Sequence, residues 1–359
     1  MLVDLLTDMI QKGGSDLHIT TGARPRIRKG RNLIDLEDYP PLTPEDTKRF
    51  CYSILSESQI ERFERELQID ISFGIKGLSR FRANIFVQRG AITGVFRAIP
   101  FSIKTLEALR LPSIISTLAL KPHGLVIISG QRSTGKSTTI ASMIDMINNT
   151  RQCHIITIED PLEFLHSHKK ALVNQREVNT DASDIITSIK SALRQDPDVL
   201  MIDELENAEV IELAITAAER GHLVITSMTS SSVIMTIKRI IEQFPPHQQE
   251  QIRFRLSYVL EGIVCQQLVR RQDNTGILPA CEILIATPAV KNLLKEDNTK
   301  QIYSLMQSMT DMQTMNQSLA DLFEKKYIDK ETAIGATYAV EELNLLLTKG
   351  GVLTKKHHI

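Results

Sequence analysis

The stretch Leu125-Val-Ile-Ile-Ser-Gly-Gln-Arg-Ser-Thr-Gly-Lys-Ser-Thr-Thr139 decides how this chain folds. Its first five residues form an apolar run typical of a buried strand, and a helical pattern follows over 136–148. Between the two, residues 130–137 match the pattern G-x-x-x-x-G-K-[S/T]. The backbone N–H groups of such a loop, and the first turn of the helix after it, bind phosphate oxygens. The stretch therefore predicts a strand, a phosphate-binding loop and a helix, in that order.

The side chains of this loop predict a nucleotide with a magnesium ion. An ammonium at Lys136 meets the β- and γ-phosphates, and the hydroxyl of Ser137 ligates Mg²⁺. We therefore expect ATP and Mg²⁺ as cofactors. The predicted nucleotide-binding residues are Gly130, Ser133, Thr134, Gly135, Lys136, Ser137 and Thr138.

The residues after the loop predict an α/β domain over 113–285. Further short apolar runs occur at 155–158, 199–202 and 223–226, with helical patterns near 182–194 and 207–220 between them. Strands that alternate with helices predict a parallel sheet with helices on both faces. Such sheets bind ligands at the carboxyl ends of their strands.

Carboxylates follow two of the predicted strands. Asp203 and Glu204 come directly after the run at 199–202, where an ATPase places a ligand for Mg²⁺ and a carboxylate that polarises the attacking water. We therefore predict Asp203 as a metal ligand and Glu204 as a catalytic residue. Residues 159–163 bring three more carboxylates to the same edge. These either take part in the chemistry or cap a helix, with the proline following the acid.

Residues 1–100 read as a smaller α+β domain. Thr43 is a predicted helix N-cap before Pro44, and the alternation over 80–87 predicts a half-buried strand. Residues 101–112 are the predicted linker, and residues 286–359 a C-terminal helical region.

Composition excludes several classes of protein. Among 359 residues, 42 Lys and Arg face 43 Asp and Glu, so no basic field predicts a nucleic-acid partner. The four cysteines are far apart, which favours free thiols in a reducing compartment. There is no signal-peptide pattern and no apolar run of about 18 residues, and we therefore expect a cytoplasmic protein.

The order of motifs resembles the type II/IV secretion ATPases, and within them the type IV pilus retraction ATPases. After the phosphate-binding loop come the motifs at 158–164, 173–178, 193–198 and 217–223; residues 14–19, 73–82 and 289–296 fit the same branch. The resemblance implies a PAS-like N-terminal domain, a RecA-like ATPase domain and a ring of six subunits. It also implies that ATP binds between the two domains and that hydrolysis drives pilus depolymerisation at the inner membrane.

The resemblance also implies roles for individual residues. Glu204 corresponds to the Walker B glutamate, Glu163 to the Asp box and His222 to the first histidine of the His box. Arg82 and Arg97 correspond to arginines that reach the γ-phosphate, whereas an isolated strand arginine more commonly pairs with a neighbouring acid. The implied partners are a homo-hexamer, or one mixed with a related ATPase, and an inner-membrane pilus platform protein. Contact with the membrane is then only peripheral.

Departures from the family pattern gather around the nucleotide. The family has glycine at Ser133, Arg-Asp at residues 206–207 and a second histidine at Thr229. One interpretation is that Arg132 in the loop offsets Glu206. Two functions stay open: a retraction motor, or a catalytically weak or inactive paralogue that acts as an accessory subunit to another retraction ATPase.

Overall fold

The computed structural model describes residues 1–30, 32–99 and 103–348. The chain packs as two units, one formed by Met1–Ser102 with Glu163–Leu165 and the other by Ile103–Leu162 with His166–Ile359. Residues 101–102 of the predicted linker and residues 349–359 of the predicted helical region lie outside the described residues.

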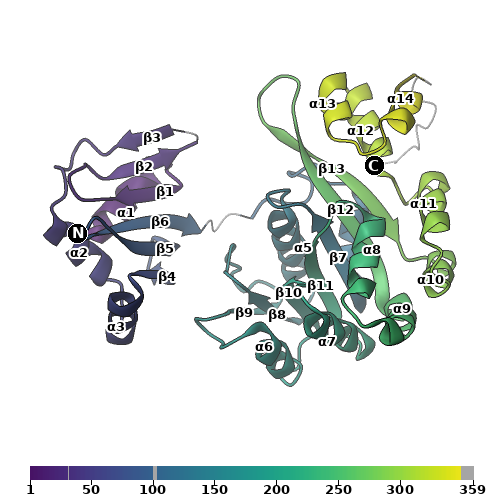
Figure 1. Cartoon of the computed structure of the whole chain (residues 1–359), viewed down its shortest axis with the longest axis horizontal. Coiled ribbons are helices and arrows are strands. Elements are labelled where there is room, and N and C mark those ends of the chain that lie inside the picture. The colour runs from purple at the N-terminus through teal and green to yellow at the C-terminus, as the bar shows by residue number, and fades with distance from the viewer. Residues whose placement is uncertain (31, 100–102, 349–359) are drawn as a thin grey trace. The chain divides into compact units, whose positions relative to one another are not determined.

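The N-terminal unit is an α+β structure built on one antiparallel sheet (Figure 1). Its strands and helices are β1 (Asp16–Ile19), β2 (Arg26–Lys29), β3 (Asn32–Asp35), β4 (Gln68–Ile75), β5 (Ser79–Gln88), β6 (Ala91–Ile99), α1 (Leu2–Gln11), α2 (Pro44–Tyr52) and α3 (Glu57–Glu66). The strand order is β3-β2-β1-β6-β5-β4. The predicted helix start is confirmed, because the Thr43 hydroxyl accepts the N–H of Asp46 and Pro44 occupies the first turn.

The two faces of this antiparallel sheet differ in chemistry. On one face, apolar side chains such as Phe81 and Phe96 are fully buried with those of the helices. On the other, strand register aligns Arg82 of β5, Arg97 of β6 and Asp16 of β1 in one row. Directly opposed residues share a face, so two arginines project from adjacent strands of a rigid sheet.

The second unit is built on a mixed, mostly parallel sheet. Its strands are β7 (Gly124–Gly130), β8 (His154–Glu159), β9 (Leu172–Glu177), β10 (Val199–Glu204), β11 (Leu223–Thr229), β12 (Leu260–Arg270) and β13 (Ile277–Ile285). They lie in the order β13-β12-β7-β11-β10-β8-β9, and only the β12–β13 pair is antiparallel. The predicted α/β class, with an α+β domain before it, is confirmed. The hairpin of β12 and β13 was not predicted.

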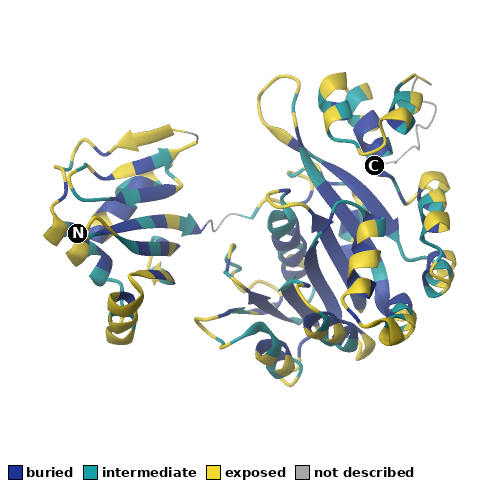
Figure 2. Cartoon of the chain, viewed as in Figure 1, coloured by how far each residue is buried: buried dark blue, intermediate teal, exposed yellow. Residues whose placement is uncertain are grey.

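Helices cover both faces of this sheet. They are α4 (Ile114–Ala119), α5 (Lys136–Thr150), α6 (Ile185–Ala192), α7 (Ala208–Glu219), α8 (Val233–Glu242) and α9 (Pro246–Val259). Alternate residues of β7 separate two cores: Val126 and Ile128 pack with α4 and α5, whereas Leu125 and Ile127 pack with α6 to α9. Figure 2 shows the central strands buried and the outer helix faces exposed. This alternation is what holds β7 at the centre of the unit.

In the described residues after β13, which end at residue 348, the chain forms five more helices. They are α10 (Pro288–Lys295), α11 (Thr299–Ser308), α12 (Met315–Glu324), α13 (Lys330–Gly335) and α14 (Val340–Thr348). Part of the predicted linker also belongs to this unit, since Leu106 and Leu111 are buried in the core formed with α5.

Within the described residues, no helix combines the length and the apolar character needed to cross a membrane.

A buried carboxylate lies beneath the start of α8. Glu282 of β13 is 3% exposed, and its Oε2 accepts the N–H of Val233, the first residue of that helix, at 3.0 Å. Burial raises the pKa of Glu282 to about 7, the Val233 N–H opposes this, and the charge of Glu342 adds to it. Ionisation of Glu282 therefore costs the folded state free energy near neutral pH.

Replacement of Glu282 by glutamine should stabilise the protein increasingly as the pH rises. The unfolded carboxyl ionises near pH 4–5, whereas the folded one resists ionisation up to about pH 7. Between these two pH values the free energy of unfolding of the wild type therefore falls by up to about 3 kcal/mol. The free energy of unfolding of Glu282→Gln does not fall in this way. Thermal unfolding at pH 5 and pH 8 measures the difference, with the exposed Glu250→Gln as control. A Glu282→Gln effect that is the same at both pH values contradicts the prediction.

Candidate active site

The loop between β7 and α5 has the backbone of a phosphate-binding loop. Gly130, Ser133 and Gly135 have φ angles of 153°, 62° and 87°. The second glycine ends the loop, and α5 begins at the next residue, Lys136, which leaves the first N–H groups of the helix without carbonyl partners inside it. The predicted order of strand, loop and helix is confirmed by these elements.

Lys136 folds back over its own loop. Its ammonium donates to the carbonyl oxygens of Gly130 at 3.1 Å and Gln131 at 3.2 Å. Both acceptors are neutral, so the charge of the ammonium is not neutralised by these contacts. A phosphate group at the loop offers this ammonium a stronger, charge-assisted partner.

The sheet brings the predicted carboxylates to the same edge as the loop. Strands β7, β11, β10 and β8 are neighbours and all parallel, so their carboxyl ends meet at one edge. Thr229 at the end of β11 pairs directly with Gly130 at the end of β7. The register between β10 and β11 shifts between Ile202 and Glu204, which is a bulge that redirects the side chains next to it.

The two carboxylates at the end of β10 reach opposite neighbours. Oε1 of Glu204 accepts the backbone N–H of Thr229 on β11 at 2.8 Å. Oδ2 of Asp203 accepts the backbone N–H of Asp160, just after β8, at 3.1 Å. Both side chains are half-buried. Each carboxylate therefore ties β10 to an adjacent strand end and is held in place by that bond.

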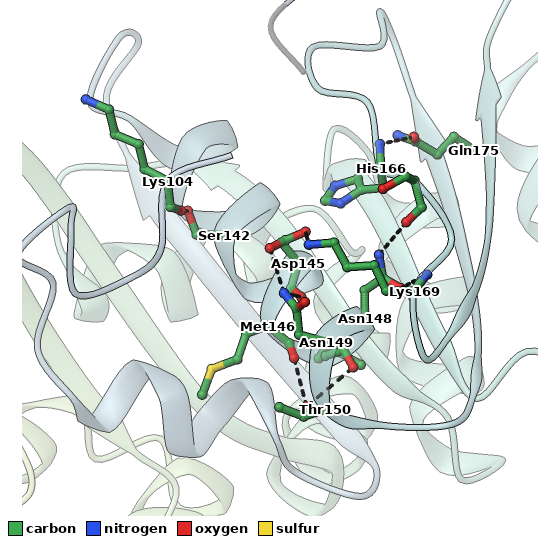
Figure 3. A network of polar contacts seen from close by, with 12 residues as sticks. Lys104, Ser142, Asp145, Met146, Asn148, Asn149, Thr150, His166, Lys169 and Gln175 are labelled. Atoms are coloured by element: carbon green, nitrogen blue, oxygen red, sulfur yellow. Dashed lines mark hydrogen bonds and ion pairs between the residues drawn. The ribbon is translucent and has the colours of Figure 1, made fainter. Parts of the chain in front are cut away.

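The segment after β8 is anchored on β9 and on the far end of α5. Glu159 is buried and accepts from the Thr157 hydroxyl at 2.6 Å and the Gln175 amide at 3.1 Å. Gln175 in turn accepts the backbone N–H of His166 at 2.8 Å. The buried amide of Asn148 donates to the carbonyl of Ser167. It also accepts the N–H of Lys169, as Figure 3 shows. Glu159 therefore helps to hold the segment after β8 in place at this edge of the sheet.

Glu163 and His222 are found in other parts of the structure than the carboxylate pair of β10. Glu163 is exposed and groups with the N-terminal unit. His222 precedes β11, and its Nδ1 lies 2.7 Å from the carbonyl of Pro197 at the amino edge of the sheet. The seven residues of β11 put about 20 Å between that edge and the loop. This placement argues against the predicted catalytic role of His222 at this loop.

The two predicted arginines lie on neighbouring strands, and Arg97 pairs with an acid. Nε of Arg97 donates to Oδ1 of Asp16 at 2.7 Å, yet the Arg97 side chain stays 70% exposed. Arg82 is exposed on the neighbouring strand. The pairing with an acid that is common for strand arginines is thus found for Arg97, and its guanidinium still faces solvent.

The departures from the family pattern have distinct structural consequences. No ion pair or hydrogen bond joins Arg132 to Glu206 in the described part of the chain, and both are exposed. Asn207 caps α7, because its side-chain oxygen accepts the N–H of Val210 at 3.1 Å. Asparagine caps as well as aspartate does, so this replacement keeps the local fold.

The donor groups at the edge fit a magnesium ion. Ser137 offers a hydroxyl and Asp203 a carboxylate, and Mg²⁺ prefers hard oxygen ligands. Among the described residues, no three His, Cys, Asp or Glu side chains form a metal-binding group. In nucleotide sites Mg²⁺ usually takes one or two protein ligands and completes its shell with phosphate oxygens and water.

One polar residue at the loop has no counterpart in the sequence motifs. Gln266 on β12 is buried, and its side chain bonds to both Thr134 and Thr139. The only signal in the sequence is the pair Gln266-Gln267 inside an otherwise apolar run of residues 263–269. That signal does not identify a partner.

A phosphate-binding loop at the carboxyl edge of a mostly parallel sheet, with an Asp-Glu pair at the end of the next strand but one, defines a P-loop ATPase. Residues 99–333 match the family model "Type II/IV secretion system protein", and the chain belongs to this family of ATPases.

Relatives with similar sequences span nearly the whole chain. It is 39% identical over 334 residues to the type IV pilus retraction ATPase PilT of Pseudomonas aeruginosa, covering 92% of this chain and 96% of that protein. It is 36% identical over 355 residues to the type IV pilus ATPase PilU of the same organism, covering 98% and 93%. A crystal structure of the pilus retraction motor PilT with bound ADP superimposes with a TM-score of 0.90 at 43% identity, over 96% of this chain and 98% of that one.

Replacement of Ser133 by glycine should stabilise the protein. The left-handed backbone of Ser133, at φ 62°, costs a residue with a Cβ atom about 1–2 kcal/mol. Glycine removes this strain and costs about 0.5–1 kcal/mol in chain entropy, so we expect a net gain of up to about 1 kcal/mol. Thermal unfolding without nucleotide measures it. The matched control is Ser113→Gly, at an exposed residue with φ −59°, which should destabilise. Equal losses in both variants contradict the prediction.

Proposed function

We propose that this protein is a pilus retraction ATPase that hydrolyses ATP at the edge formed by the loop after β7 and the end of β10. The observation that supports this most is the shared edge. The phosphate-binding loop and Glu204 lie on nearby parallel strands, and β11 between them is paired to both. The sequence likeness to PilT over nearly the whole chain supplies the type of work that hydrolysis drives.

The proposed mechanism assigns one task to each group. Backbone N–H groups from Gly130 to Thr138 bind the phosphates, and the Lys136 ammonium moves from its loop carbonyls to the β- and γ-phosphates. Glu204, fixed by the Thr229 N–H through one oxygen, orients a water molecule with the other. The water oxygen bonds to the γ-phosphorus as the bridging bond to the β-phosphate breaks. ADP and phosphate leave, and Glu204 takes part in removing the proton of the water.

Magnesium and the arginines complete the proposed site. Ser137 and Asp203 would hold Mg²⁺, which neutralises phosphate charge when bound. Arg82 and Arg97 project from the N-terminal sheet as cations suited to the γ-phosphate. Glu163 stays a candidate carboxylate of this chemistry, whereas His222, at the amino edge of the sheet, takes no part in it.

The assembly and location follow the relatives. We propose a ring of six subunits, either identical or mixed with a related ATPase, which works on an inner-membrane pilus platform protein from the cytoplasm. The likeness to PilT supports this arrangement. Contact with the membrane is then made through the platform protein.

A second function is favoured by the likeness to PilU and by the altered residues. The chain matches PilU over 98% of its length. Glu206 adds a negative charge two residues after Glu204, and Thr229 lacks the imidazole of the family pattern. In this alternative the protein binds nucleotide and joins a ring with another retraction ATPase, with little or no turnover of its own.

Steady-state ATP hydrolysis by the purified protein tests the proposal. Wild type should turn over ATP as a species with the mass of a hexamer. Lys136→Ala and Glu204→Gln should each lower the rate at least about 100-fold, since each removes a group that acts on the transferring phosphate or the water. The exposed Lys330→Ala serves as control and should keep the rate.

Three results separate the alternatives. Turnover by a hexamer, lost in both site variants, supports the motor. Nucleotide binding without turnover in wild type points to the accessory subunit, whose test is then turnover in a mixed ring. Turnover that survives both Lys136→Ala and Glu204→Gln overturns the proposed site.

A further inference from the structure

Gln266 lies on β12 at the point where the pairing of this strand with β7 ends and the phosphate-binding loop begins. The pairing of β12 with β7 ends at Cys265 and Ser129, one residue before the loop begins. Gln266 is the next residue of β12, so its side chain is placed against the loop instead of a strand. It is 3% exposed. A glutamine amide at such a depth requires partners for its polar atoms.

Both ends of the Gln266 amide are bonded to the loop and the helix after it. Nε2 donates to the carbonyl oxygen of Thr134 at 2.8 Å, and Oε1 accepts the hydroxyl of Thr139 at 2.8 Å. A backbone carbonyl can only accept, which fixes the orientation of the amide. Thr139 is 1% exposed, so solvent does not compete for either bond.

These two bonds bracket the first turn of α5. Thr134 precedes it and Thr139 follows it, while residues 135–138 between them carry the N–H groups and side chains predicted to contact phosphate. The turn also lies close to the amide, because a Cβ atom built on Gly135 would be 2.9 Å from Nε2. One side chain therefore connects both ends of this turn to β12.

We propose that Gln266 is a positioning residue for nucleotide binding: it holds the first turn of α5 at the height at which its N–H groups and Lys136 meet the phosphates. The inference rests on the proposed nucleotide site and adds a residue from a strand outside all the predicted motifs. Gln266 touches the loop and acts through it. Such placement matters for the bound nucleotide, because a misplacement of about 1 Å in a preorganised site can lower the rate of a reaction about 100-fold.

Loss of the amide should weaken nucleotide binding. Gln266→Met keeps the length of the side chain and removes both bonds, and Thr139→Val removes one bond at nearly constant volume. We expect the Kd for ADP to rise about tenfold in Gln266→Met and less in Thr139→Val. The matched control is Gln267→Met. This neighbour points to the opposite face of the sheet, is half-buried and should keep the wild-type Kd.

The experiment measures two quantities on the full-length chain. Titration with a fluorescent ADP analogue gives the Kd, and thermal unfolding without nucleotide gives the stability. A purely structural role lowers the unfolding temperature and leaves the Kd of the folded protein unchanged, whereas a positioning role raises the Kd. If Gln266→Met does not fold, Thr139→Val carries the same test.

The outcomes distinguish this inference from the proposed function. A raised Kd in Gln266→Met or Thr139→Val, with Gln267→Met unchanged, supports the positioning role even when wild type does not hydrolyse ATP. A wild-type Kd in both variants overturns the role and leaves the ATPase proposal intact. Wild type that binds no ADP overturns both.

Discussion

The turn from β7 into α5 leaves no room for a side chain at Gly130, and the rest of the ATPase unit is arranged around this constraint. A Cβ atom on Gly130 would lie 2.5 Å from the carbonyl oxygen of Gln266 and 2.5 Å from the Thr134 hydroxyl. The loop therefore lies directly against β12, and only glycine permits that approach with the positive φ angle found there. Because the loop is seated this closely, the first turn of α5 has one fixed position relative to the strand ends beside it.

The bulge at the end of β10 directs two carboxylates at the sheet edge where this turn lies. In regular strands, successive side chains point to opposite faces of the sheet and not toward neighbouring strands. The extra residue between Ile202 and Glu204 breaks that alternation. Asp203 then reaches the segment after β8, and Glu204 reaches the end of β11. Two adjacent carboxylates are thus held in different directions by backbone N–H groups, as the separate roles proposed for them require.

The sequence predicts those parts of the site whose residues are close along the chain or whose geometry follows from parallel strands. The loop, Lys136 and Ser137 belong to one continuous motif, and Asp203 and Glu204 follow from the rule that strand ends share an edge. Gln266 is some 130 residues from the loop, and strand pairing alone brings it there. The β12–β13 hairpin lacks an alternating pattern because β12 is buried on both faces over most of its length.

His222 and Thr229 show the converse limit. They lie in one family motif, which suggests a common site. A seven-residue strand separates them, so one lies at the amino edge and the other at the carboxyl edge. Residues that are close in sequence can lie far apart along a strand, because each residue advances the chain by about 3.3 Å. A helix of the same length would have kept the two within about 11 Å.

The altered residues change outward-facing groups and keep the backbone that holds the site. Asn207 still caps α7, and Thr229 still holds Glu204, because the donor is its backbone N–H and not its side chain. Ser133 adopts the left-handed conformation that the loop requires, at a cost in strain. Binding of phosphate depends on this backbone, whereas the rate of hydrolysis depends on the charges that face the transferring group. Any functional cost of the alterations should therefore fall on turnover more than on nucleotide affinity.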